Sequence, residues 1–199
     1  MITIIDYGLG NLTSVANALK KLSIACQISD SAELIQQSSG LILPGVGAAN
    51  EAMKNLKARK LDQLITNQVA VGKPLLGICL GMQLLFTRSD EGNTTCLNVI
   101  KGKVEKLKTK LKVPQIGWNQ VNTSSKSRLL KEIRNKSYFY FVHSYYCDPK
   151  DKQVAISETE YEIKFCSAVE RNNVYGVQFH PEKSSEAGLK ILKNFRNLL

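Results

Sequence analysis

The sequence predicts an α/β fold with an open, mostly parallel central sheet, helices on both faces, and a β-rich second half. In the first half, short runs of β-branched and aliphatic residues alternate with helical patterns, as in repeated strand–helix units. In the second half, strand patterns follow one another with few helices between them. The 199 residues suffice for one good-sized core, so we expect a single domain over 1–199.

Elements of the first half alternate regularly. We expect strands at 1–6, 24–28, 40–43 and 74–78, and helices over 12–22, from about 31, from 48 and over 61–69. Glycine-containing loops at 7–11 and 44–47 follow the first and third strands. Because the functional sites of parallel sheets lie at the carboxyl ends of the strands, we expect these loops and Cys79 to meet at that edge.

Strand patterns dominate the rest of the chain. We expect them at 97–107, 115–121, 138–147, 154–157, 165–170 and 174–179, with a hairpin turn at 171–173. A helix from about residue 185 closes the chain, and its apolar stripe indicates core packing.

The net charge of +10, from 27 Lys and Arg against 17 Asp and Glu, raises the question of nucleic-acid binding. The lysines are spread along the chain, and their densest run, over 101–112, has no interleaved aromatic residues. No nucleic-acid-binding module is present, so we expect no nucleic-acid partner. No apolar run approaches the roughly 20 residues of a membrane helix, and the N-terminus lacks a signal-peptide pattern. We therefore expect a cytoplasmic protein that does not bind membranes.

Five widely spaced cysteines and two histidines exclude the usual frameworks of small secreted or zinc-binding domains. No CxxC pair occurs, so neither a disulfide framework nor a structural zinc site is expected. The sequence implies no metal and no tightly held cofactor.

Cys79 stands at a predicted strand-to-helix junction, with Gly77 and Gly81 on either side. This Gly-x-nucleophile-x-Gly pattern is typical of a nucleophile elbow, where bulky flanking side chains would collide with neighbouring backbone. The first free N–H groups of the helix favour a thiolate there. The alternative is that Cys79 is a buried structural thiol.

A catalytic cysteine needs a base, and the sequence offers His143 and His180. Two residues after His180, in an extended segment, Glu182 can reach the same side and orient the ring. His143 has no such carboxylate, which favours a structural role. We therefore predict a catalytic triad of Cys79, His180 and Glu182.

These motifs carry a family resemblance that runs over essentially the whole chain. Residues 77–83 and 177–182, with 44–47 as the oxyanion strand, resemble the class I, triad-type glutamine amidotransferases. Within that group, residues 6–12, Met82, 116–119, 140–146 and 180–184 resemble the glutaminase subunits of imidazole glycerol phosphate synthases. One local departure is Gln115, where that group usually has histidine.

The resemblance implies that glutamine is hydrolysed to glutamate and ammonia by the triad, with no cofactor. It places the oxyanion hole at the N–H groups of Val46 and Leu80, the former after a peptide rearrangement. It also implies a glutamine pocket formed by Gly47, Gln83, Ser144 and Tyr145.

By the same resemblance, ammonia passes to a (β/α)-barrel cyclase subunit in a heterodimer, which makes imidazole glycerol phosphate and the carboxamide nucleotide of purine synthesis. Asn11, Trp118, Tyr140 and Lys183 would lie at that interface. Trp118 could equally be a core aromatic, and Lys183 a solvated charge. Two rival functions stay open: a related glutaminase that serves another synthase, as Gln115 and the high charge allow, and a non-catalytic binding or regulatory subunit.

Overall fold

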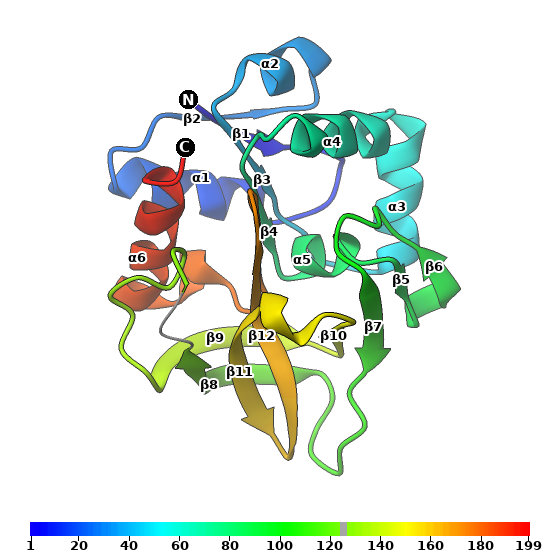
Figure 1. The fold of residues 1–199 in the computed structure, drawn as a ribbon, viewed down its shortest axis with the longest axis vertical. Coiled ribbons are helices and arrows are strands. Elements are labelled where there is room, and N and C mark those ends of the chain that lie inside the picture. Colours follow the sequence, from blue (N-terminus) through cyan, green and yellow to red (C-terminus); the bar gives the residue numbers. More distant parts are fainter. Residues whose placement is uncertain (124–126) are drawn as a thin grey trace.

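The computed structural model describes residues 1–123 and 127–199, and its central feature is one long sheet (Figure 1). Five neighbouring strands are parallel: β2 (Cys26–Ser29), β1 (Ile2–Ile5), β3 (Gly40–Leu43), β4 (Leu75–Ile78) and β13 (Val174–Val177). The sheet continues through β12 (Ile163–Arg171), β10 (Tyr145–Pro149), β7 (Gly102–Lys106), β5 (Arg88–Ser89) and β6 (Thr94–Thr95). In this second part β5 and β7 pair in parallel, and the other pairs are antiparallel.

A branch of antiparallel strands extends from β12. It consists of β11 (Ala155–Tyr161), β8 (Gln115–Thr123) and β9 (Ser137–His143). In Figure 1 this branch and β12 fill the lower half of the molecule, below the layered half that carries the helices.

Helices cover both faces of the parallel strands, which confirms the predicted fold class (Figure 1). One face packs against α1 (Leu12–Lys21) and α6 (Ser185–Arg196), and the other against α2 (Ala32–Gln37), α3 (Ala49–Ala58), α4 (Leu61–Ala70) and α5 (Leu80–Leu84). Successive strand residues serve opposite cores: Ile4 packs with α1 and α6, whereas Ile5 packs with α3 and α4. This is why the strands read as continuous apolar runs.

The second half corrects two of the predicted strands. Residues 97–101 are not extended, because the N–H groups of Leu97, Asn98 and Val99 bond to carbonyls at the end of α5 and just beyond it. The predicted strand at 138–147 is two strands that meet at Ser144, where the chain leaves its pairing with β8 for a pairing with β7. The predicted hairpin turn is confirmed, with Asn172 at φ +54° between β12 and β13.

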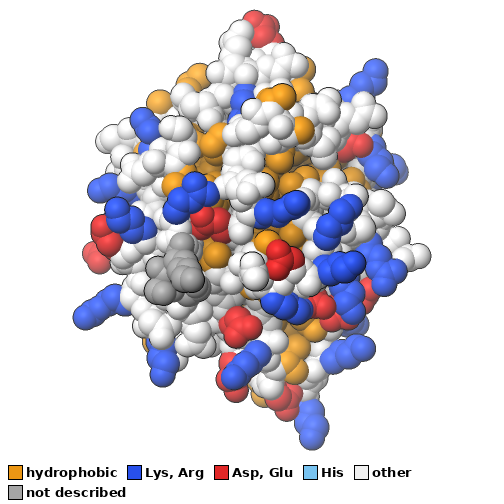
Figure 2. Space-filling model, viewed as in Figure 1, with side chains coloured by type: hydrophobic (Ala, Val, Ile, Leu, Met, Phe, Trp, Pro, Cys, Tyr) orange, Lys and Arg blue, Asp and Glu red, His pale blue; other side chains and the backbone are white. Residues whose placement is uncertain are grey.

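Short elements escaped the sequence analysis. They are β5, β6 and the 3-10 turns η1 (Glu91–Asn93), η2 (Lys152–Val154) and η3 (Pro181–Lys183). Two- and three-residue elements carry no periodicity from which to predict them. In the described ranges, no helix combines the length and apolar character that a membrane crossing requires. Lys and Arg side chains are dispersed among Asp and Glu over the face drawn in Figure 2.

The loops that follow β1 and β3 meet the start of α5 at the carboxyl edge of the sheet, as expected. The Tyr7 hydroxyl donates to the Pro44 carbonyl at 2.8 Å. A Cβ added to Gly45 would lie 2.5 Å from the Tyr7 hydroxyl and 2.9 Å from the Leu80 Cβ. Only glycine allows this contact, which brings the segments that follow β1, β3 and β4 together at the edge of the sheet.

The tightest of these contacts predicts a large effect of one methyl group. A Cβ at Gly81 would lie 1.7 Å from the Leu43 carbonyl oxygen, whereas a Cβ at Gly72 would touch nothing within 4 Å. Gly81→Ala should lower the free energy of unfolding by about 3 kcal/mol or more, because backbone must move. The control Gly72→Ala has only its positive φ to oppose it and should cost about 1 kcal/mol. Equal urea midpoints for the two variants would contradict this account.

Candidate active site

Cys79 occupies the turn between β4 and α5 with backbone angles of φ 53° and ψ −111°. A non-glycine residue at positive φ stores strain, typically about 1–3 kcal/mol, and persists only where its surroundings hold it. The Cys79 N–H donates to the Val177 carbonyl at 2.8 Å, and this bond joins the turn to β13. The Cys79 side chain is only 5% exposed.

The glycines on either side allow this turn to exist. A Cβ on Gly77 would lie 2.7 Å from the Gly81 carbonyl oxygen and from the Met82 nitrogen, and one on Gly81 would overlap the Leu43 carbonyl. The elbow predicted from the sequence is therefore present, and for the predicted reason, since backbone occupies the space of both missing side chains.

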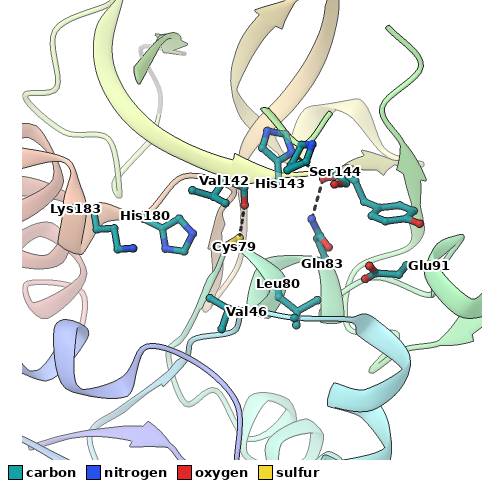
Figure 3. Close-up of a pocket in the computed structure, with 13 residues that line it drawn as sticks. Val46, Cys79, Leu80, Gln83, Glu91, Val142, His143, Ser144, His180 and Lys183 are labelled. Carbon is teal, nitrogen blue, oxygen red and sulfur yellow. Dashed lines mark hydrogen bonds between the residues drawn. The ribbon is translucent and has the colours of Figure 1, made fainter. Parts of the chain in front are cut away.

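His180 and Glu182 lie on the segment that follows β13. The His180 N–H donates to the Tyr140 carbonyl at 2.9 Å, which fixes the backbone of the segment against β9. Its ring Nδ1 is 2.9 Å from Glu182 Oε1, and the ring lies beside the Cys79 sulfur (Figure 3). The segment forms the turn η3 rather than the extended chain that we expected, but the predicted contact between the two side chains is made.

Burial alone would lower the pKa of His180, but the neighbouring Cys79 sulfur and Glu182 carboxylate outweigh it and raise the pKa well above 6.5. Glu182 strengthens this effect, because its Oε2 is buried and has no hydrogen-bond partner in the described structure. Protonation of His180 therefore stabilises the fold fully below pH 6.5, and that contribution is lost as the pH rises through the raised pKa.

The triad opens into a pocket of about 240 Å³ (Figure 3). Its lining brings together every residue predicted for the oxyanion hole and for glutamine binding: Val46, Gly47, Leu80, Gln83, Ser144 and Tyr145. These residues come from the β3–α3 loop, α5 and the junction of β9 and β10. These three segments, far apart in the sequence, thus meet the segment that carries His180 around one sulfur atom.

Glu91 is a pocket residue that the sequence analysis missed. It lies in η1, and its Oε2 accepts the Ala49 N–H at the start of α3 at 2.8 Å. Figure 3 places its carboxylate across the pocket from His180, with Cys79 and Gln83 between them. No motif marks this position, because only the fold carries η1 to the pocket.

His143 also lines the pocket, but both of its ring nitrogens are engaged. Nδ1 lies 2.8 Å from the Tyr145 carbonyl, and Nε2 lies 3.0 Å from the Gln115 side-chain amide. Burial lowers the pKa of His143 to about 4, the positive charge of His180 adds to this, and the bond to Tyr145 opposes it. The ring is therefore neutral near pH 7, which fits the structural role that the sequence favoured.

Three of the residues predicted for a partner interface form one cluster beside the triad. The rings of Trp118 and Tyr140, on paired positions of β8 and β9, meet edge to face with centroids 6.1 Å apart. The Lys183 ammonium lies 5.8 Å from the centre of the Tyr140 ring. Trp118 is 51% exposed, so it is not a core aromatic. Asn11 precedes the first residue of α1.

Metal ligands do not converge anywhere in residues 1–123 and 127–199: no three His, Cys, Asp or Glu side chains are grouped as a metal site would require. The chemistry that this site can perform is nucleophilic attack by sulfur, with a histidine that moves protons and a carboxylate that orients it.

Comparison with known proteins points to the same chemistry. The family model described as glutamine amidotransferase class-I matches residues 3–198. The chain belongs to this family. It is 47% identical over 199 residues to the imidazole glycerol phosphate synthase subunit HisH of Moorella thermoacetica, covering all of this chain and 95% of that one. It is 44% identical to the Bacillus subtilis protein of the same name, covering 100% and 96% of the two chains.

A solved structure agrees at the level of the fold. The PurLQS structure from Thermotoga maritima matches with a TM-score of 0.78 and 16% identity, covering 98% of this chain and 97% of that one. Membership of the family makes this chain a glutamine-hydrolysing amidotransferase, as the resemblance implied.

With only two histidines in the chain, titration by NMR can test the charge state of the site. The His180 imidazole should stay protonated through neutral pH and titrate only in the alkaline range, whereas His143 should titrate near pH 4. In Cys79→Ala the sulfur partner is lost, so the pKa of His180 should fall while that of His143 stays low. A His143→Gln variant assigns the signals, and a wild-type His180 that titrates near 6.5 would contradict the proposed pairing.

Proposed function

We propose that this chain, as one domain over 1–199, is the glutaminase subunit of an imidazole glycerol phosphate synthase and acts through Cys79, His180 and Glu182. The observation that carries the proposal is that Cys79 and His180 line one pocket, while the Glu182 carboxylate lies 2.9 Å from the His180 ring. The names of the relatives at 44–47% identity supply the synthase and, with it, histidine biosynthesis.

In the first half of the reaction the Cys79 thiolate adds to the γ-carbonyl carbon of glutamine. The oxyanion is stabilised by the N–H of Leu80, at the start of α5, and by the N–H of Val46 after a rearrangement of that peptide. Protonated His180 then gives its proton to the leaving nitrogen, so the C–N bond breaks and ammonia departs. A glutamyl thioester remains on the sulfur.

In the second half, neutral His180 takes a proton from water as the water oxygen attacks the thioester carbon. The C–S bond breaks, glutamate is released, and the thiolate and the imidazolium are restored. Glu182 keeps Nε2 of the ring directed at the reacting atoms, because its Oε1 holds Nδ1.

The pocket explains how glutamine is oriented. The amide end of glutamine must reach Cys79, so the α-amino and α-carboxylate groups of the substrate extend toward Glu91 and the β9–β10 junction. The Glu91 carboxylate suits the α-ammonium group by charge. Gly47, Gln83, Ser144 and Tyr145 form the surrounding wall.

A barrel-shaped cyclase subunit is the partner that we propose for the exposed face beside the triad. Ile116, Trp118 and Tyr138 lie on β8 and β9 and are each more than half exposed, which is unusual for large apolar side chains that cluster. Aromatic residues of this kind are frequent anchors of interfaces. Ammonia released at Cys79 would pass across this face. The five free cysteines suit a reducing compartment, so we place the complex in the cytoplasm.

The direct test is glutamate release from glutamine, by the purified chain alone and with a cyclase barrel subunit loaded with its nucleotide substrate. Strong stimulation by the loaded barrel supports the synthase proposed here. Hydrolysis that the barrel leaves unchanged would point to another synthase, and no hydrolysis in either case would support a non-catalytic subunit.

Loss of the nucleophile should separate chemistry from assembly. Cys79→Ala should lower glutamate release by at least about 10⁴-fold, since no other group can form the thioester, and should leave binding to the barrel intact. Cys96→Ala, which removes another buried thiol outside the pocket lining, is the matched control and should retain activity. Full hydrolysis by the Cys79 variant would rule out the triad.

Removal of the exposed indole should separate assembly from chemistry. Trp118→Ala should weaken binding to the barrel subunit by about 2 kcal/mol, or about thirtyfold, as expected for a central aromatic anchor. Hydrolysis by the isolated chain should not change. Val71→Ala removes another exposed apolar side chain, beyond α4, and should leave the affinity unaltered. Equal affinities of the wild type and Trp118→Ala, measured by calorimetry, would move the interface elsewhere.

A further inference from the structure

Gln178 is a fully buried amide that the mechanism above does not use. It lies between β13 and His180, with no exposed surface, and its side-chain nitrogen is 3.7 Å from the Cys79 sulfur. Its side-chain oxygen accepts from Gln83 Nε2 at 3.0 Å. Gln83 is itself only 4% exposed and donates from the same nitrogen to the Tyr145 carbonyl at 2.9 Å. A buried chain of hydrogen bonds therefore runs from a pocket wall to the nucleophile.

One backbone carbonyl sets the direction of this chain. The Tyr145 oxygen can only accept, so Gln83 must present its amide nitrogen there. The same nitrogen faces Gln178, which must therefore present its oxygen to Gln83. The Gln178 nitrogen is then directed at the Cys79 sulfur. His143 Nδ1 lies 2.8 Å from the same carbonyl and holds it in place from another side.

An N–H donor that faces sulfur stabilises the thiolate more than the thiol, because the donor interacts with the negative charge. A second partner acts in the opposite sense: the Val142 carbonyl, 3.6 Å from the sulfur, accepts a hydrogen bond from the thiol form only. Burial strengthens the effect of the donor, since little water competes for it.

We propose that Gln178 is a further catalytic residue, whose amide N–H stabilises the Cys79 thiolate, and that Gln83 and the Tyr145 carbonyl fix the orientation of that amide. The segment that carries His180 thus brings two groups to the sulfur. Gln83 acquires a positioning role in addition to its place in the pocket wall. This inference rests on the proposed function only in treating Cys79 as the nucleophile.

The test is the pH dependence of Cys79 alkylation by iodoacetamide, followed by mass spectrometry of the peptide that contains Cys79. Alkylation reports the thiolate fraction without turnover. Gln178→Leu keeps the bulk but removes the donor, so the thiolate fraction should fall and alkylation on the rising part of the pH profile should slow about tenfold. The kcat for glutamine hydrolysis should fall in parallel, with KM little changed.

Two further variants separate this role from a structural one. Gln178→Glu keeps the shape but turns an acceptor toward the thiolate, so it should slow alkylation on the rising part of the pH profile at least as much. Asn194→Leu removes another buried amide, which donates to the Leu129 and Lys131 carbonyls in a different part of the core, and should leave alkylation unchanged.

An alkylation midpoint in Gln178→Leu equal to that of the wild type would overturn the proposal. If that variant does not fold, an unchanged midpoint in Gln178→Glu would overturn it instead. Failure of the proposed function looks different: the wild type would release no glutamate, whatever the alkylation profiles show.

Discussion

The close approach of the β3 carbonyl end to the first turn of α5 is the constraint on which the site depends. The Leu43 carbonyl oxygen occupies the space where a Cβ on Gly81 would be. The backbone of the turn itself occupies the space where a Cβ on Gly77 would be. Packed in this way, the turn has no room to relax, and Cys79 is held at a positive φ that a cysteine would otherwise avoid. The sulfur is therefore placed by backbone contacts, before any side chain of the triad acts on it.

The other half of the molecule supplies what surrounds the sulfur. β13 pairs with β4, and the segment after β13 brings Gln178 and His180 to the sulfur. The junction of β9 and β10 supplies the far wall of the pocket. The same β9 pairs with β8 to expose Trp118 next to Tyr140 and Lys183. The Tyr140 carbonyl also accepts the His180 N–H, so the exposed aromatic cluster and His180 both contact β9. A partner that binds this face would contact Tyr140, whose carbonyl is hydrogen-bonded to His180.

Much of this arrangement could be predicted from the sequence, because its signals are local. The parallel strands appear as apolar runs, and the elbow follows from two glycines around Cys79. What could not be predicted depends on distant contacts. The segment 97–101 has the sequence pattern of a strand, but its N–H groups donate to carbonyls at the end of α5 and just beyond it. Glu91 reaches the pocket only because the chain folds back to cap α3. Gln178 stood inside a recognised motif, yet its orientation toward sulfur follows from a carbonyl 33 positions earlier, at Tyr145.

Of the five cysteines, Cys79 is the one that this backbone cage holds in the pocket, and we propose it as the nucleophile. The most direct test is acid quenching of the protein during turnover of saturating glutamine, followed by peptide mass spectrometry. We expect a glutamyl thioester on the peptide that contains Cys79 and on no other cysteine. A glutamyl group on Cys26, Cys96, Cys147 or Cys166 would contradict it, since those thiols lie outside the pocket that the strand ends enclose.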